Sequence, residues 1–151
     1  MAKTFLVSGP RYREVYVNEQ QVGIGCANRR DDVWLVQLLL KIATESVPDS
    51  PGFVPPNQQM IEPNGVWGPQ TLAYIKFFQD ELDRRQNKKL VERDGRVDPV
   101  MTGNTRSSIS QTFYTILALN ATMRRRRADN FRIENEPKFP IELKSTLFLN
   151  W

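Results

Sequence analysis

A stretch of twenty residues in the first half of the chain, SVPDSPGFVPPNQQMIEPNG, limits most strongly what this chain can fold into. It spans residues 46–65 and contains five prolines and two glycines. Proline lacks a backbone N–H and restricts the residue before it, so this stretch cannot form a continuous helix. We therefore predict a long loop that separates two helical regions. Loops of this length are unusual in compact domains, so this one either has a docking role or packs passively on the domain.

The residues before the loop carry the pattern of a helix with two apolar stripes. We predict a helix from about Asp32 to Glu45, with Asp31 or Asp32 as its N-cap. A small three-helix domain needs only one apolar stripe on each helix, so the second stripe requires a cover, either a terminal extension or another molecule. The first stripe comprises Val33, Val36, Leu40 and Ala43, and the second comprises Trp34, Leu35, Leu38 and Ile42.

A compact turn leads into a second helix directly after the loop, in the sequence NGVWGPQTLAYIKFFQ. Asn64-Gly65 is a turn signal, and Pro69 suits the first turn of a helix. Thr71 lies near the helix start, where its hydroxyl can bond backbone groups. The charged segment DELDRRQNKK ends the helix with basic residues, which the helix dipole favours. The apolar residues that recur at helical spacing are Ile75, Phe78 and Leu82.

An imperfect second copy of this pattern follows. The sequence DGRVDPVMTGNTRSSI repeats the order of NGVWGPQTLAYI: a turn with glycine, an apolar residue, a proline, a threonine and then a helix. This similarity predicts two related turn-helix units packed together. The helix of the second unit is expected from about Thr105 to Arg126. The run Arg124–Arg127 at its end either contacts phosphates or acidic lipid or is a solvated helix end, and the helix dipole favours the second. The expected apolar stripe comprises Ile109, Phe113, Ile116, Leu117 and Met123.

The two ends of the chain differ from this helical part. Glu14–Val17 alternates polar and apolar residues, and together with Gln21–Gly25 it predicts a β-hairpin. The last eleven residues include large apolar side chains that are costly to leave in water, so the tail packs on the domain or docks on a partner. They include Ile141, Leu143, Leu147, Leu149 and Trp151. The expected parts are an N-terminal extension (1–27), a helical domain (28–127) with a long loop insertion at 46–64, and an extended C-terminal tail (128–151).

The absence of histidine and the presence of a single cysteine exclude several kinds of active site. Catalytic triads that use histidine cannot form, and a usual zinc site needs histidine or several cysteines. The sequence also lacks a glycine-rich phosphate loop with its lysine. We therefore expect no cofactor and no metal. The net charge of +4 and the pI near 9.4 favour anionic partners, without choosing among nucleic acid, acidic lipid and cell-wall polymer.

No segment of the sequence has the pattern of a membrane span or an export signal. No apolar run approaches the roughly 20 residues that a membrane span needs. The N-terminus also lacks the apolar run of a signal peptide, so we expect synthesis in the cytoplasm. A protein of this kind would reach the periplasm or the cell wall through lysis, or as part of a phage particle or a contractile secretion machine.

Three segments, in the order NRRDDVWLVQLLL, NGVWGPQTLAYIKFFQ and DGRVDP, resemble the peptidoglycan-binding-like domain family of bacterial and phage proteins. The resemblance covers roughly residues 28–117. Its middle motif is specific because seven positions agree at fixed spacing, with Trp67 in place of the usual phenylalanine. The matching positions are Asp32, Val33, Val36, Gln37, Leu39 and Leu40, then Gly65, Trp67, Gly68, Thr71, Ile75, Phe78 and Gln79, and finally Asp94, Gly95, Val97 and Pro99.

This resemblance implies a mainly α fold, a three-helix peptidoglycan-binding-like bundle, here with an N-terminal β-hairpin-like segment and an extended C-terminal tail. It also implies non-catalytic binding of cell-wall peptidoglycan, through its glycan or its stem peptides. Glycan binding uses aromatic faces against sugar rings together with a few polar side chains. The candidate ligand-binding residues near the helix ends are Trp34, Trp67, Gln70, Tyr74, Arg29 and Arg30.

Other classes of function remain open beside wall binding. A structural or adaptor subunit of a phage tail or contractile injection system would use the same fold to dock protein subunits of a larger assembly, and the second stripe, the long loop and the apolar tail favour this. An enzyme using carboxylate chemistry would draw on acids such as Glu81, Glu92 and Asp94, which nothing separates from surface acids. No nucleic-acid partner is expected, because no aromatic platform accompanies the arginine run.

Overall fold

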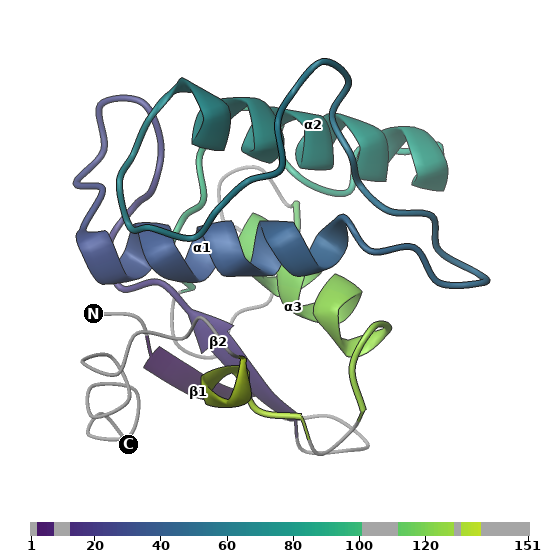
Figure 1. The fold of residues 1–151 in the computed structure, drawn as a ribbon, viewed down its shortest axis with the longest axis horizontal. Helices are drawn as coiled ribbons and strands as arrows, with labels where there is room; N and C mark the ends of the chain where they lie inside the picture. The colour runs from purple at the N-terminus through teal and green to yellow at the C-terminus, as the bar shows by residue number, and fades with distance from the viewer. Residues whose placement is uncertain (1–2, 8–12, 101–111, 129–130, 137–151) are drawn as a thin grey trace.

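Three helices packed together make this protein mainly α, as the sequence predicts. They are α1 (Arg30–Ala43), α2 (Pro69–Gln86) and α3 (Thr115–Arg124). Figure 1 shows α1 in the middle of the molecule, with α2 on one side and α3 and the strands on the other. The predicted C-terminal tail lies mostly outside the described residues. The computed structural model describes residues 3–7, 13–100, 112–128 and 131–136.

Both apolar stripes of α1 are buried, as its central position requires. The residues of the second stripe are at most 3% exposed. The cover of this stripe therefore lies within the chain itself, and the described elements that contact α1 include α2, α3 and β2 (Arg13–Val17). Tyr16 and Val17 of β2 belong to the same core, so the N-terminal extension is packed into the helical domain.

The helix α1 begins two residues earlier than predicted, and neither aspartate is its N-cap. Arg29 occupies the N-cap position and makes no side-chain cap hydrogen bond. The carboxylate of Asp32 is fully buried and accepts hydrogen bonds from the N–H groups of Glu19 (2.9 Å) and Gln20 (3.0 Å) instead. Asp32 thus fastens the preceding loop to the start of α1, and the prediction of a capping role was wrong.

The predicted hairpin partner of Glu14–Val17 was also wrong. The strand β2 contains these residues, but it pairs antiparallel with β1 (Lys3–Val7). In the segment Gln21–Gly25, Val22 forms an isolated bridge with Val97. The physical reason is that Asp32 binds the two N–H groups that follow β2, so this backbone turns towards α1 and does not fold back along the strand.

The long loop has no helix, as its prolines predict, and it is bound closely to the helices. The Phe53 N–H donates to the carbonyl of Ala43 at the end of α1 (2.8 Å). Further along, Ile61 is buried with 1% exposure. In Figure 1 the loop leaves the end of α1, rises over α2 and returns across α1 to the start of α2. The loop therefore forms part of the domain surface.

The third helix begins ten residues later than predicted, at Thr115 instead of Thr105. The N–H of Phe113 donates to the Leu90 carbonyl (2.9 Å), and Phe113 forms a parallel bridge with Val91. These contacts hold the backbone before α3 in an extended conformation, so Phe113 is not part of the helical stripe. Ile116 and Met123 of the predicted stripe are buried on α3, whereas Ile109 and Thr105 lie outside the described residues.

A buried glutamine on α1 holds the turn that precedes α2. The Oε1 of Gln37 accepts hydrogen bonds from the N–H groups of Asn64 and Gly65, both at 2.9 Å. Its Nε2 donates to the Val66 carbonyl and to the Thr71 hydroxyl, both at 3.0 Å. Gly65 has φ +77°, and a Cβ there would lie 2.6 Å from a side-chain carbon of Arg30. The turn therefore needs glycine in order to approach α1 so closely.

A second buried glutamine, on α2, repeats this arrangement. The Oε1 of Gln79 accepts from the Gly95 N–H (2.9 Å), and its Nε2 donates to the Arg96 carbonyl and to the Thr115 hydroxyl, both at 3.0 Å. Gly95 has φ +71°, and a Cβ there would lie 2.8 Å from Leu72. The repeat predicted from NG and DG is therefore present in three dimensions, and its second threonine is Thr115.

An asparagine on α3 holds the strand β2 in a related way. Asn120 Oδ1 accepts from the Tyr16 N–H (2.7 Å), and its Nδ2 donates to the Tyr16 carbonyl (2.8 Å). The Tyr16 hydroxyl in turn accepts from the Ile133 N–H (2.9 Å) in the short 3-10 helix η1 (Ile133–Asn135). Each helix thus carries one buried amide that pairs with the backbone of another segment.

Replacing Gln79 by leucine is expected to lower the free energy of unfolding by at least about 2 kcal/mol, because the backbone groups of the turn would lose their buried partner. Urea unfolding followed by circular dichroism measures this change. Gln58→Leu, in an exposed part of the loop, is the matched control and should shift the free energy by less than about 0.5 kcal/mol. Equal stability of Gln79→Leu and the wild type would mean that packing alone holds the turn.

Candidate functional site

Two of the three aromatic side chains predicted to bind sugar are buried. Trp34 is 3% exposed and Tyr74 is 2% exposed. The Tyr74 hydroxyl donates to the Gln59 carbonyl (2.6 Å) and accepts from the Ile61 N–H (3.2 Å), which places this ring beneath the long loop. Neither ring therefore offers a face that a sugar can contact.

The other four predicted ligand residues lie nearer the surface. Gln70 is half-buried and donates to the same Gln59 carbonyl as Tyr74 does (3.0 Å), so these two predicted residues meet at the loop. Trp67 is half-buried and packs against the core. Arg29 and Arg30 are exposed at the start of α1. None of the six predicted residues lines either of the two cavities described below.

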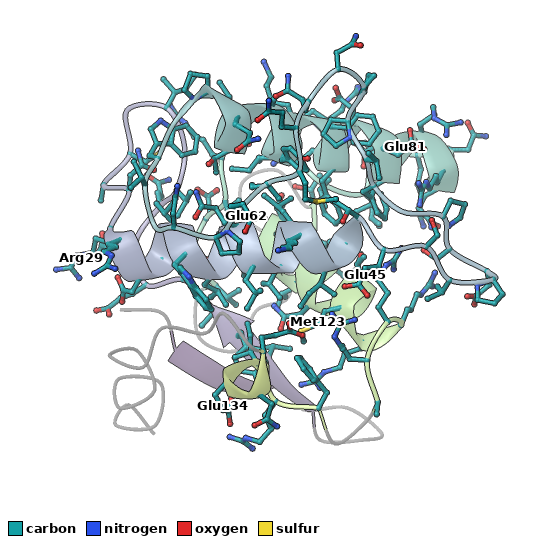
Figure 2. All side chains as sticks on the ribbon, viewed as in Figure 1. Arg29, Glu45, Glu62, Glu81, Met123 and Glu134 are labelled. Carbon is teal, nitrogen blue, oxygen red and sulfur yellow. The ribbon has the colours of Figure 1, made fainter. Side chains whose placement is uncertain are left out.

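A groove lies between the second half of α2, the helix α3 and the first part of the long loop. Its volume is about 470 Å³, within the range of roughly 300 to 1,000 Å³ that small-molecule sites occupy. Figure 2 shows Glu45 and Glu81 at the end of the molecule where this part of the loop runs, and Arg29 at the opposite end of α1. The lining includes apolar Phe53, Leu82, Leu90, Ala118 and Ala121, and polar or charged Asp49, Arg85, Gln86, Thr122 and Arg125.

Two arginines hold the loop that forms one wall of this groove. Arg85 of α2 donates to the carbonyl of Pro51 (2.8 Å). Arg126 at the end of α3 donates to the carbonyls of Glu45 (2.6 Å) and Ser50 (3.0 Å). A proline-rich loop makes few hydrogen bonds of its own, so these guanidinium groups satisfy carbonyls that would otherwise depend on water. The wall is therefore fixed by side chains from two helices.

Phe53 anchors the same wall from inside. It is 5% exposed, and its ring centroid lies 4.7 Å from that of Phe78 on α2. The guanidinium carbon of Arg85 lies 3.9 Å from the centroid of the Phe53 ring, in a cation–π arrangement. The aromatic residue of the groove is thus engaged with its own protein.

The arginine run is largely structural, where the sequence favoured a solvated helix end. Arg127 binds both carboxylate oxygens of Glu45 (2.7 and 2.8 Å) and also Glu136 (3.1 Å). These contacts lower the pKa of Glu45 and raise that of Arg127. Arg124 donates to the Phe131 carbonyl (3.0 Å). Since Arg126 binds carbonyls of the long loop, three of the four arginines have backbone or acidic partners within the protein.

Arg125 differs from its neighbours. It is exposed and lines the groove, and its side chain makes no hydrogen bond or ion pair with any residue in the part of the chain that the structure describes. The same is true of Asp49 and Gln86, which also line the groove. Burial lowers the pKa of Arg126 and the nearby charges of Arg85 and Arg125 lower it further, whereas the charges of Glu45 and Asp49 raise it. The groove therefore contains charges of both signs, and the guanidinium of Arg125 and the carboxylate of Asp49 form no hydrogen bond or ion pair among the described residues.

The acids named as enzyme candidates are engaged in local contacts. Glu81 pairs with Arg84 and with Arg85 (2.9 Å), and hydrogen bonding to Arg84 lowers the pKa of Glu81 to about 2. Glu92 pairs with Lys89 (3.1 Å). Asp94 accepts the N–H of the residue two positions later, within the turn of the second unit. Within residues 3–7, 13–100, 112–128 and 131–136, no group of three or more acids or cysteines is placed to hold a metal ion.

A second, smaller cavity of about 190 Å³ lies beside the end of α1. Its charged lining residues are already paired. Lys41 lies 3.5 Å from Glu62, and Glu45 and Glu136 both pair with Arg127. This cavity therefore offers a ligand less unpaired charge than the groove does, and the groove is the better candidate site.

The sequence interpretation missed Phe53, Arg85 and Arg125 as members of one site. Signals for two of them were present, because the long loop and the arginine run both departed from an ordinary three-helix pattern. The missing information was that the first part of the loop returns to the far end of α2, which brings residues from three separate segments together.

Comparisons with protein-family models, with curated proteins and with solved structures gave no match. The family resemblance seen in the sequence therefore stays a prediction. No helix within the described ranges is both long and apolar enough to cross a membrane.

Replacing Glu81 by glutamine is expected to reduce stability in a pH-dependent way. Because the folded-state pKa of Glu81 is about 2 and the ordinary value is 4.5, its ion pairs stabilise the fold fully above pH 4.5. That contribution is lost as the pH falls from 4.5 to about 2. The stability difference between the wild type and Glu81→Gln should therefore be largest near neutral pH and shrink over this interval, as measured by urea unfolding at each pH.

The control for this experiment is Asp80→Asn, which removes a neighbouring exposed acid for which no ion pair is seen among the described residues. It should change stability little at any pH. A Glu81→Gln difference that stays constant down to pH 2 would contradict the assignment of this stabilisation to the ion pairs with Arg84 and Arg85.

Proposed function

We propose that this protein binds bacterial cell-wall peptidoglycan without cleaving it, and that the ligand lies in the groove between α2, α3 and the long loop. The observation that carries the proposal is the presence of an uncommitted guanidinium, Arg125, and an uncommitted carboxylate, Asp49, in one groove. The stem peptides of peptidoglycan carry both carboxylates and amines, so a groove with a free charge of each sign is complementary to them.

The resemblance to the peptidoglycan-binding-like family supports this proposal, and the structure gives its motif positions physical roles. Gln37 and Gly65 belong to the first buried clamp, and Gln79 and Gly95 belong to the second. These positions hold a turn against a helix, so the motif describes the architecture of the domain. A chain can keep such a motif while its ligand contacts come from other residues, as the groove requires here.

The setting that we propose is a phage particle or a contractile secretion machine, which would bring the protein to the wall. The positive net charge suits this role, because the wall carries anionic groups. The electrostatic attraction would act before contact and would weaken as salt screens it.

The second candidate is an adaptor subunit of a phage tail or contractile injection system. One observation favours it specifically: the burial of Trp34 and Tyr74 removes two aromatic faces that a glycan-binding surface would use. The exposed apolar side chains of Ile24 and Val66, at 59% and 67%, lie on the surface that a protein partner would contact in this case.

Purified protein is expected to sediment with insoluble peptidoglycan at low salt, and the bound fraction should fall as salt increases. Insoluble cellulose serves as the control matrix, because it offers sugar rings without stem peptides. Failure of the folded protein to sediment with peptidoglycan at low salt would reject wall binding and favour the adaptor. Equal sedimentation with both matrices would reject the groove as the site, since cellulose lacks the charges that the groove complements.

A further inference from the structure

The groove does not suit a sugar ring. Carbohydrate sites place an aromatic face against the sugar. The aromatic residue lining this groove, Phe53, contacts Phe78 and lies beneath the guanidinium of Arg85, and only 5% of it is exposed. A sugar would have to displace Arg85, which also holds the carbonyls of Pro51 and Gly52. The glycan strand is therefore a poor occupant.

The apolar lining of the groove suits small side chains. Ala118 and Ala121 of α3 and Leu82 and Leu90 on the α2 side contribute only aliphatic groups. Methyl groups of a ligand are stabilised when they are buried against such a surface. A peptide rich in alanine matches this lining better than a polyhydroxylated sugar does.

The polar lining of the groove suits a short peptide with charges of both signs. A guanidinium such as that of Arg125 binds a carboxylate with two parallel hydrogen bonds. The Asp49 carboxylate complements an ammonium group, and the free amide of Gln86 provides donors and an acceptor for peptide groups. Since none of these three side chains has a hydrogen-bond partner among the described residues, binding a ligand breaks no internal hydrogen bond or ion pair of theirs.

The wall of the groove is already in place before a ligand binds. Arg85 and Arg126 fix the loop carbonyls from Ser50 to Gly52, and Phe53 is anchored in the core. A preformed site does not have to order a loop on binding, so a small number of contacts can give useful affinity.

We propose that the groove binds the peptide stem of peptidoglycan and not its glycan strand, with a stem carboxylate on Arg125 and the side-chain amine of the stem's diamino acid on Asp49. This inference rests on the proposed function and names the part of the polymer that the site takes. It makes Arg125 and Asp49 the residues that determine specificity.

The test is calorimetric titration of the full chain with soluble probes. The first probe is the stem tetrapeptide L-alanyl-γ-D-glutamyl-L-lysyl-D-alanine. The others are the same peptide with its carboxylates amidated, the same peptide with its lysine amine acetylated, an all-L peptide of the same composition with ordinary α-linkages, and a tetramer of N-acetylglucosamine. The unmodified stem peptide should bind, each modification should weaken binding about tenfold, and the sugar should not bind.

Matched variants assign the charges. Arg125→Gln should weaken the unmodified peptide about tenfold and leave the amidated peptide unchanged, because that peptide has lost the partner of Arg125. Asp49→Asn should behave in the same way towards the acetylated peptide. Lys76→Gln removes a positive charge of α2 at an exposed position that does not line the groove, and should have no effect. Ala121→Trp, at an exposed position on α3, should block the groove.

Each remaining result overturns the inference in a recognisable way. Binding of the sugar without the peptide would assign the glycan strand as the ligand. Equal affinity for the all-L peptide would indicate a protein partner, and an effect of Lys76→Gln equal to that of Arg125→Gln would show that Arg125 acts through overall charge and not as a contact in the groove. Sedimentation with whole peptidoglycan but no affinity for any stem peptide would reject this inference and leave the proposed function standing, whereas absence of sedimentation would reject the function itself.

Discussion

The rest of the structure depends on one buried side-chain amide on each helix. Gln37 and Gln79 hold the turns that lead to the next helix, and Asn120 holds a strand. An amide carries two N–H donors and an oxygen acceptor, so it satisfies both kinds of backbone group at once. This pairing lets a turn lie directly on a helix without exposing its backbone to water or leaving it unpaired. The glycine in each turn then permits the close approach. The positions of two turns and of the strand β2 relative to the helices follow from these contacts.

The long loop follows the same physical rule with charged donors. Its prolines remove N–H groups and leave carbonyls that cannot be satisfied by regular structure. Arg85 and Arg126 supply the missing donors from two different helices, and Glu81 orients Arg85 through its ion pair. The proline-rich loop therefore has a fixed position although it contains no helix, and it forms a defined wall of the groove. The shape of the candidate site thus depends on the same side chains that make the loop compatible with a compact domain.

The sequence allowed the fold class and the first two helices to be predicted, because helical periodicity and turn signals are local. The errors came from partners distant in the chain. Thr115, which bonds to Gln79, lies twenty positions after Gly95, whereas Thr71 follows Gly65 by six, so a comparison by residue order chose the nearer Thr105, ten positions after Gly95. Asp32 looked like a helix cap because its partners, the N–H groups of Glu19 and Gln20, cannot be recognised without the fold. Likewise, nothing local to Tyr74 shows that the long loop covers its ring. For Trp34 the second apolar stripe predicted a cover, but local pattern did not identify the segment that supplies it.

The arginine run shows why residue type alone does not define the candidate site. Arg124 is the last residue of α3 and the other three arginines lie in the turn that follows, so neighbours in the run meet different surroundings. Arg124 reaches the Phe131 carbonyl, Arg126 reaches the loop and Arg127 reaches Glu45 and Glu136. Arg125 is directed to the groove, where no described residue pairs with it. The motif residues hold turns against the helices, and three of the four arginines bind backbone or acidic partners within the protein. Arg125 is therefore the arginine of this run that can bind a charged ligand in the proposed site. It lies at the groove because α3 ends at the preceding residue.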